Sequence, residues 1–377
     1  MSALPRFTAE LRKLVLLLRA DPRAVAAGVI APTAILLVFW ITFGNMSSLG
    51  IAVVNHDAGR LGARLEHHIL AQTSPAGGRP YFTSRTGDEQ EALELYERGQ
   101  IAGVVVIGED FTRRVEDRGS LAVEFHVNNY SADMAKNLRL YLQEGIVSFY
   151  DAEYPGYDLQ VDEEYTVDSQ VDWFELIAAG IFMLAFLIGS MFSLLYLLFA
   201  EKTLGTAAEY ALSPAGPWPF WCARLLFSLL LGALTAAFNG VLIRVVCGLN
   251  VTAFLLPALV PLVLITGIWM AVATILALSV RQFAGAAVGA MVAAVLCWFL
   301  GGGTSPARYL AGPERVLAEA IPNTWALGLI RSRAFGYPVD DAGASYRLLV
   351  VVCAILLATA TLMYHRRFAR RRPGGRG

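Results

Sequence analysis

The sequence predicts a polytopic α-helical membrane protein with six transmembrane helices and an α/β extracytoplasmic domain inserted between the first and second. Three observations lead to this prediction. Apolar residues make up 56% of the 377 residues and charged residues only 16%, whereas soluble domains have about 45–50% and about 25%. Several apolar runs are long enough to cross a hydrocarbon core, which takes about 20 helical residues. One long polar stretch, residues 45–172, follows the first of these runs.

The charges are segregated along the chain, although the net charge is only −1. Residues 45–172 contain 22 acidic and 10 basic residues, out of 31 and 30 in the whole chain, so the remainder has a net charge of about +11. Cytoplasmic loops of membrane proteins are enriched in Lys and Arg. We therefore expect residues 45–172 outside the cytoplasm and both termini inside it, in a multi-pass protein of the cytoplasmic (inner) membrane.

Residues 1–23 are predicted to form a cytoplasmic amphipathic helix in the membrane interface, because apolar residues recur at helical spacing among several basic ones. Pro22 breaks this helix. Residues 24–44 then form the first span, with Trp40 at the depth of an interfacial aromatic belt. A cleaved signal peptide is the rival interpretation, but the basic region ahead is too long for one. A retained anchor is therefore expected.

Residues 45–172 are predicted to form a water-soluble α/β domain, because strand-like and helix-like segments alternate along them. Roughly 130 residues are enough for one hydrophobic core. The alternation predicts a largely parallel or mixed sheet. The predicted strands are 49–55, 81–83, 101–107 and 121–127, and the predicted helices are 61–71, 88–98, 111–118 and 132–150.

A bundle of five further spans is predicted within residues 173–365. Six spans in total return the C-terminus to the side of the N-terminus, which agrees with the basic cytoplasmic tail 366–377. Residues 304–346 are semi-apolar and are predicted to form two short helices that lie in the outer interface or dip into it, separated by Pro322. The five spans are expected at about 173–199, 219–246, 254–280, 283–303 and 347–365.

No catalytic residue and no metal site are predicted. The sequence contains no G-x-x-x-x-G-K-[ST] motif to hold the phosphates of ATP. The adjacent pair His67-His68 is expected on a solvated helix face rather than around a metal. The four cysteines lie in or at the ends of apolar runs, so inert buried thiols are expected rather than a disulfide framework. The chain is therefore not expected to be an enzyme by itself.

Polar side chains inside the spans are candidates for a translocation path, because each costs free energy in lipid unless it finds a partner. Hydrogen bonding between helices is the alternative interpretation, and for Asn239 neither is favoured. The candidates are Ser190, Ser193, Thr235, Asn239, Thr266 and Trp269. On the fifth span small residues recur every four positions, which lets helices approach closely and predicts tight packing. These small residues are Gly285, Gly289 and Ala293.

The polar stretch between the second and third spans, residues 201–214, is predicted to form one short helix exposed to water. Pro214, Pro217 and Pro219 prevent its continuation. A partner that pushes on such a helix would tilt both flanking spans together. We expect Glu201 and Glu209 on its exposed face, where they would suit a cationic groove on the partner.

The pattern Glu-x-x-x-Gly-Thr-x-x-x-x-x-x-Ser-Pro in this stretch resembles the coupling-helix region of ABC-2 type transporter permeases. The strings IAVVNHD, GQIAGVVVIGEDF and NNYSADMA resemble the external domain of one branch of that family, and IPNTWALGLIRSRAFG resembles its segment before the last span. The resemblance assigns coupling to Glu201, Gly205, Thr206, Glu209, Ser213 and Pro214. Lys202 and Thr203 depart from the usual pattern.

The resemblance implies the permease subunit of an ABC exporter, which forms the translocation pathway as a dimer with a second copy or a paralogue. It implies two copies of a cytosolic ABC ATPase that bind ATP and magnesium, and no cofactor in this chain. The implied substrate is hydrophobic or amphipathic, a drug or a lipid-like molecule. The first and fifth spans are placed along the dimer seam. The expected partners include the lipid bilayer and no nucleic acid. The resemblance leaves open whether a periplasmic adaptor is also a partner.

One alternative from another class is a membrane-anchored surface protein whose extracytoplasmic domain binds a partner without any transport. Five returning spans exceed what an anchor needs, and buried polar groups with small residues favour a moving bundle. Co-purification with an ATPase subunit discriminates between the two hypotheses.

Overall fold

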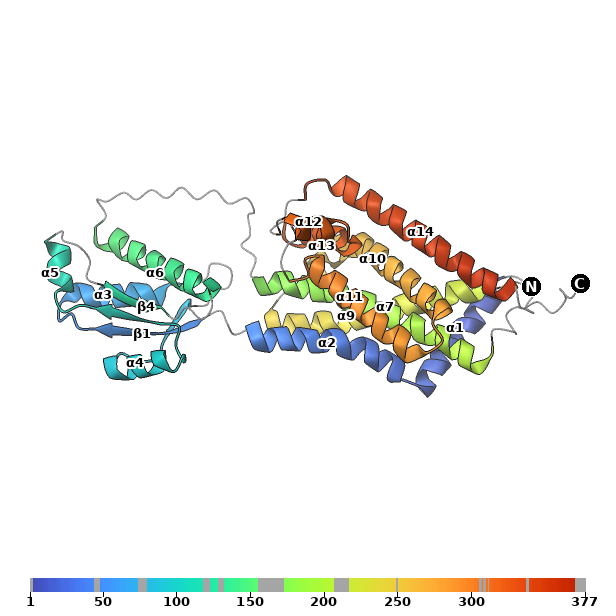
Figure 1. Ribbon diagram of the computed structural model, residues 1–377, viewed down its shortest axis with the longest axis horizontal. Coiled ribbons are helices and arrows are strands. Elements are labelled where there is room, and N and C mark those ends of the chain that lie inside the picture. The colour runs from blue at the N-terminus through green and yellow to red at the C-terminus, as the bar shows by residue number, and fades with distance from the viewer. Residues whose placement is uncertain are drawn as a thin grey trace, which may run out of the picture. The chain divides into compact units, whose positions relative to one another are not determined.

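The computed structural model describes residues 3–43, 48–73, 80–117, 123–127, 132–154, 173–206, 217–248, 250–304, 307, 310, 312–336 and 339–369. The chain divides into two compact units. One unit is Ile41–Gln170, and the other combines Met1–Trp40 with Val171–Gly377. The first contains a β-sheet and the second is helical (Figure 1).

The sheet of the first unit has four strands in the order β2-β1-β3-β4. β1 is parallel to β2 and to β3, whereas β4 is antiparallel to β3. The sheet is therefore mixed, which is one of the two arrangements predicted. The strands are β1 (Leu49–Asn55), β2 (Phe82–Ser84), β3 (Gly103–Ile107) and β4 (Val123–Val127). The helices are α3 (Arg60–Ala71), α4 (Glu89–Glu97), α5 (Phe111–Glu116) and α6 (Ala132–Glu153).

Helices cover both faces of this sheet (Figure 1). Successive residues of a strand point to opposite faces, and β1 is apolar on both. Ile51 and Val53 are buried with α3, α5 and α6. Ala52 and Val54 are buried with Ala92 of α4. This explains why β1 and β3 are continuous apolar runs instead of alternating ones.

One carboxylate ties the turn after β1 to two helices. Asp57 accepts hydrogen bonds from the N–H and hydroxyl of Thr112 (3.1 and 2.6 Å) and from the N–H of Gly62 (3.0 Å). Burial by itself raises the pKa of Asp57, but these hydrogen bonds outweigh it and hold the pKa below the ordinary value of 3.8. The ionised carboxylate is thus part of the folded unit.

The second unit is a bundle of long helices. Its elements are α1 (Ala3–Ala20), α2 (Arg23–Phe43), α7 (Trp173–Leu204), α9 (Trp218–Cys247), α10 (Val251–Ser279), α11 (Phe283–Leu300), α12 (Gly312–Glu319), α13 (Pro322–Phe335) and α14 (Ala342–Ala369). Five described helices are long and apolar enough to cross a membrane. They are Phe174–Leu204, Trp218–Val246, Leu256–Ser279, Phe283–Leu300 and Ala342–Arg367. The protein is therefore a polytopic helical membrane protein.

α7 is the central helix of the bundle. It is apolar all round. Of the residues in its most apolar 18-residue stretch, 94% are buried, against 22–56% in the corresponding stretches of the other four candidate spans. A helix without a polar face is expected in the interior. α9, α10, α11 and α13 pack against α7, and α14 packs on α10 (Figure 1). The outward faces of α9 and α14 are apolar, as lipid-facing surfaces are.

One prediction for this unit was wrong in detail. α7 continues through Leu204, so residues 201–204 form its last turn rather than the start of a separate helix. Gly205, with φ +69°, ends the helix in the left-handed conformation that glycine favours. α13 packs into the bundle, where Leu327, Ile330 and Arg331 are buried. Pro322 is the first residue of α13.

The buried polar groups of α13 explain its position. Arg331 donates to the carbonyls of Leu176 (3.3 Å) and Gly303 (3.1 Å). Asn323 accepts a hydrogen bond from the indole N–H of Trp269 (3.1 Å). Polar groups at membrane depth need such partners. The helix is therefore held inside the bundle by hydrogen bonds as well as by its apolar residues.

Replacing Asp57 by Ala is expected to destabilise the α/β unit by about 1–3 kcal/mol at pH 7, because three donors lose their acceptor. A lowered folded pKa stabilises the fold above the ordinary pKa. The advantage of the wild type should therefore shrink as the pH falls below about 3.8. Hydrogen exchange of residues 49–117 in the full-length protein, corrected for intrinsic rates, measures both effects.

The matched control is Asp110→Ala, which removes an exposed ion pair with Arg113 (2.8 Å). Exposed pairs contribute about 0–1 kcal/mol, so this variant should stay near the wild type. Equal protection in the Asp57 and Asp110 variants would contradict the role of Asp57.

Candidate functional site

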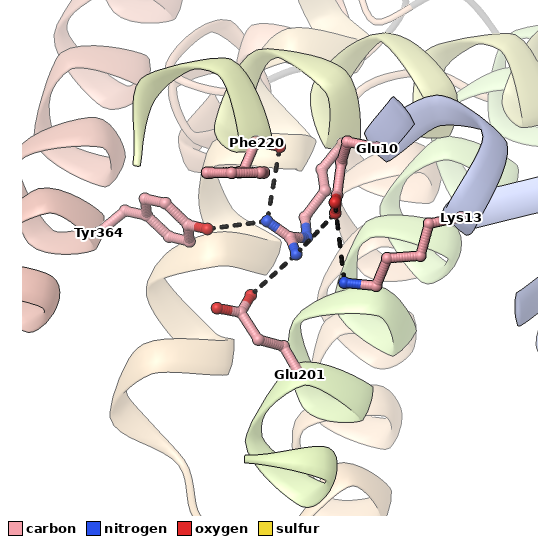
Figure 2. A network of polar contacts seen from close by, with 6 residues as sticks. Glu10, Lys13, Glu201, Phe220 and Tyr364 are labelled. Atoms are coloured by element: carbon pink, nitrogen blue, oxygen red, sulfur yellow. Dashed lines mark hydrogen bonds and ion pairs between the residues drawn. The ribbon is translucent and has the colours of Figure 1, made fainter. Parts of the chain in front are cut away.

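The end of α7 carries the first residues of the predicted coupling motif, and Glu201 there is buried. Its side chain is 6% exposed, and its Oε2 lies 3.5 Å from Nη2 of Arg224 on α9. The prediction that Glu201 faces a partner on the protein surface was therefore wrong. The last turn of α7 packs inside the bundle, and this directs Glu201 towards α9 (Figure 2).

Arg224 is the centre of a charged cluster formed by Glu10, Lys13, Glu201, Arg224 and Tyr364, of which all but Lys13 are buried. Its side chain is 2% exposed. Nη2 of Arg224 lies 3.1 Å from Oε1 of Glu10 on α1, and Nη1 donates to the hydroxyl of Tyr364 on α14 (2.9 Å). Lys13 lies 3.7 Å from the other oxygen of Glu10. The charged cluster thus pairs two cations with two carboxylates, and its members come from α1, α7, α9 and α14 (Figure 2).

Aromatic packing supports the α9–α14 side of this cluster. The rings of Trp221 and Tyr364 stack with centroids 4.7 Å apart and planes at 27°. The indole N–H of Trp221 donates to the hydroxyl of Thr361 (3.2 Å). Both rings are almost completely buried. The Tyr364 hydroxyl is therefore fixed in place to accept from Arg224.

Lys202, the next residue after Glu201, ties the same turn to the end of α10. Its ammonium donates to the carbonyls of Ala277 and Val280, the latter at 2.9 Å, and lies 4.3 Å from the Phe199 ring centroid. Arg367 of α14 donates to the carbonyl of Leu278 (3.4 Å). Cations at a helix C-terminus interact favourably with its unpaired carbonyls.

Adjacent residues of the motif thus attach α7 to different neighbours. Glu201 holds α9 and, through Arg224, α1 and α14, whereas Lys202 holds α10. A displacement of the chain after Gly205 would therefore act on α1, α9, α10 and α14 at the end of the bundle where α7 ends. Lys202, a departure from the usual family pattern, has a structural partner of its own here.

The other predicted coupling residues are only partly described. Gly205 is exposed and Thr206 is half-buried. Glu209, Ser213 and Pro214 lie outside the described residues.

The six residues predicted for a translocation path are all buried in the bundle. Ser193 and Thr235 donate to carbonyls one turn back (2.7 and 3.0 Å). Asn239 donates to the carbonyl of Thr235 (3.0 Å) and accepts from Thr33 on α2 (3.3 Å). Trp269 bonds to α13, as described above. Ser190 and Thr266 are buried without a hydrogen-bond partner for their hydroxyls.

The structure does not bring these six side chains together around one described opening. Ser190 lies where α7 and α9 approach most closely, because a Cβ on Gly232 would come within 1.9 Å of its hydroxyl. Among the described residues, these polar groups therefore lie at contacts between helices.

The small residues of α11 divide between two faces. Ala286, Ala290 and Ala294 are buried within the bundle. Gly285 and Gly289 are exposed, and a Cβ on either would meet nothing within 4 Å. Ala293 is half-buried. The two glycines therefore make no close packing contact with the part of the chain that the structure describes.

Sequence reasoning missed Glu10, Arg224 and Tyr364 as members of the site. Two signals were present. Arg224 stands inside an apolar helix, where a charge needs a partner, and Glu10 is one helical turn from Leu14, which is buried against α7 and α9.

These features define a multi-pass helical membrane protein with a charged cluster at one end of its bundle. Residues 25–362 match the family model described as ABC-2 family transporter protein. The match covers most of the 377 residues, so the chain belongs to the ABC-2 transporter family and is an ABC-2 type permease. The predicted resemblance is confirmed. Permeases of this family work with an ABC ATPase subunit and are not themselves catalytic. No curated protein and no solved structure matches the chain.

Replacing Arg224 by Gln is expected to destabilise the bundle by about 3–5 kcal/mol, because Glu201 stays buried after losing its cation. Thermal unfolding of the purified full-length protein in detergent measures the loss. The double variant Glu201→Gln/Arg224→Gln should recover part of it, since no uncompensated carboxylate then remains at the end of α7.

Arg315→Gln is the matched control, since it removes an exposed pair with Glu319 (2.7 Å), and solvent screens such a pair so that it adds little to stability. A loss of stability in Arg224→Gln no larger than in this control would show that the charged cluster does not hold the helices together.

Proposed function

We propose that this chain is the permease subunit of an ABC exporter and forms the translocation pathway as a dimer, with a second copy or a paralogue. Two cytosolic ABC ATPase subunits would bind ATP and magnesium and drive the cycle. The exported substrate would be hydrophobic or amphipathic, a drug or a lipid-like molecule. The observation that carries this proposal is the attachment of the coupling-motif residues Glu201 and Lys202 to the surrounding helices in a chain of the ABC-2 family.

We infer that α2 is the sixth span. It has 21 residues, which at about 1.5 Å each extend over about 31 Å, enough for a hydrocarbon core of about 30 Å. Its described part includes the apolar stretch Gly28–Ile41. Leu36 is buried in the bundle, whereas Ile30, Val38 and Ile41 are exposed in the manner of lipid-facing residues.

Six spans place both termini on the same side of the membrane. The acidic residues 45–172 and the basic remainder of the chain support an orientation with the α/β unit outside the cytoplasm. The charged cluster and the end of α7 then lie at the cytoplasmic end of the bundle, in the inner membrane. This is the end that a cytosolic ATPase reaches.

The proposed cycle uses the two attachments of the last turn of α7. ATP binding would bring the ATPase subunits together and displace the segment after Gly205. Glu201 would transmit this displacement to α1, α9 and α14 through Arg224, and Lys202 would transmit it to α10. The ATPase can shift the equilibrium between two bundle states only if it contacts them with different affinity.

The proposal predicts that an ATPase co-purifies with the full-length chain from native membranes in mild detergent. Quantitative mass spectrometry should find a subunit with a Walker A motif at one copy per permease. The isolated chain should not hydrolyse ATP. Absence of any ATPase from the preparation, or hydrolysis by the isolated chain, would overturn the proposal in favour of a surface-binding protein or an enzyme.

The dimer makes a second prediction. Gly289→Trp should lower the dimeric fraction, because Gly289 is on the open face of α11 and a close helix contact there has no room for an indole. The fold of one chain should tolerate it, since nothing lies within 4 Å of the Cβ position. Photobleaching steps of labelled chains in nanodiscs measure the fraction.

The control is Leu234→Trp on the outward face of α9, where Leu234 is 63% exposed, and it should keep the dimeric fraction of the wild type. Equal dimeric fractions for Gly289→Trp and Leu234→Trp would exclude this face of α11 as the seam.

A further inference from the structure

α1 has two faces of different character. On its inner face Leu14 is buried against Leu197 of α7 and Leu231 of α9. Glu10, on the same side of α1, reaches Arg224 in the charged cluster (Figure 2). The apolar residues of this inner face are therefore used for packing within the bundle.

The opposite face of α1 is exposed and carries both cations and apolar side chains. Arg12 and Arg19 are seven residues apart, about two helical turns, so they project from the same side. Val15 and Leu16 lie between them on that side and are 39% and 56% exposed. We call Arg12, Val15, Leu16 and Arg19 the outward face of α1. This face offers apolar surface between two positive charges.

The cations of the outward face are not balanced by neighbouring carboxylates. Neither Arg12 nor Arg19 forms an ion pair with a residue that the structure describes, whereas Lys13 is paired with Glu10. Glu10 is the only acidic residue of α1, and it is buried on the inner face. A partner that fits the outward face therefore combines negative charge with an apolar region.

The level of α1 along the bundle favours lipid as that partner. Leu197, which contacts the inner face of α1, lies seven residues before Leu204 at the end of α7, about 10 Å of helix. Leu231, the second contact, lies within the candidate span Trp218–Val246. Its neighbour Leu230 is 57% exposed on the outward face of α9. α1 therefore lies beside the spans, at a depth similar to the 5–10 Å or so to which interfacial helices are buried.

We propose that the outward face of α1 binds the anionic phospholipids of the membrane surface. Val15 and Leu16 would contact the acyl chains next to the headgroups, and Arg12 and Arg19 would pair with the anionic headgroups. Zwitterionic lipid would cover the apolar residues but lacks the net charge that attracts the two arginines. Because the inner face of the same helix supplies Glu10 to Arg224, lipid that holds α1 in place also stabilises the charged cluster.

Hydrogen exchange of the full-length chain in nanodiscs tests this binding. Residues 3–20 should exchange more slowly in equal parts of phosphatidylglycerol and phosphatidylcholine than in phosphatidylcholine alone, because α1 must leave the lipid surface before its amides open. An arginine near an anionic surface strengthens binding about fivefold, equivalent to about 1 kcal/mol. Equal exchange of residues 3–20 in the two lipids would overturn the proposal.

Variants locate the binding face. Arg12→Gln and Arg19→Gln should each reduce the slowing about fivefold, and the double variant should exchange at the same rate in both lipids. The matched control is Arg98→Gln/Arg113→Gln, which removes two exposed cations from the α/β unit and should respond to phosphatidylglycerol as the wild type does. A response of the Arg12→Gln/Arg19→Gln variant as large as that of the control would exclude the outward face.

Thermal unfolding in the same nanodiscs tests the link to the charged cluster. Phosphatidylglycerol should raise the Tm of the wild type, because a ligand that binds the folded state stabilises it. It should raise the Tm of Arg12→Gln/Arg19→Gln less. An equal rise in both proteins would overturn the link between lipid binding and the stability of the bundle.

An acidic surface of an ATPase subunit is another occupant that the two arginines would suit. Residues 3–20 would then exchange alike in both lipids and slow only in the complex with the ATPase, which would overturn the lipid proposal. Failure of the lipid response with an ATPase still co-purifying would leave the permease assignment intact. A lipid response without any co-purified ATPase would instead keep the lipid surface and contradict the proposed function.

Discussion

The bundle depends on the burial of the Arg224 guanidinium between two carboxylates. A buried guanidinium has lost its water, and only close carboxylates and hydrogen-bond acceptors offset that loss. Glu10, Glu201 and Tyr364 supply them from three other helices. None of these helices can move away from this end without exposing or separating a charge. The ion pairs and hydrogen bonds of Arg224 therefore determine which helix ends meet. Apolar contacts alone would allow the helices to slide along one another.

The same constraint links the fold to transport as we propose it. α7 is buried along most of its length, more than any other candidate span. Its last turn carries both Glu201 and Lys202, and its end at Gly205 releases the chain towards the segment that an ATPase would contact. A force on that segment would therefore act directly on α7, the most buried helix of the bundle.

Prediction from sequence succeeded where local pattern and composition decide the outcome. Long apolar runs predicted six spans, and five described helices are long and apolar enough to cross a membrane. The strands β1 and β3 were predicted from apolar runs bounded by turns, and both are central in the sheet. The resemblance of residues 201–214 to a coupling-helix region pointed to the family, and the match over residues 25–362 confirms it. The prediction failed where the direction of a side chain mattered, as for Glu201, which was expected in water and lies against Arg224.

The sequence by itself determined the membrane class, the position of the polar α/β stretch and the family, since hydropathy, charge and motif spacing are properties of the chain in order. Only the tertiary structure decided that Glu10, Glu201, Arg224 and Tyr364 form one cluster, because they are up to hundreds of positions apart and meet through helix packing. It also decided that α13 enters the bundle and that Arg12 and Arg19 lie on the exposed face of α1. The physical reason is that a charge in an apolar helix requires a partner, but its sequence does not say which helix supplies it.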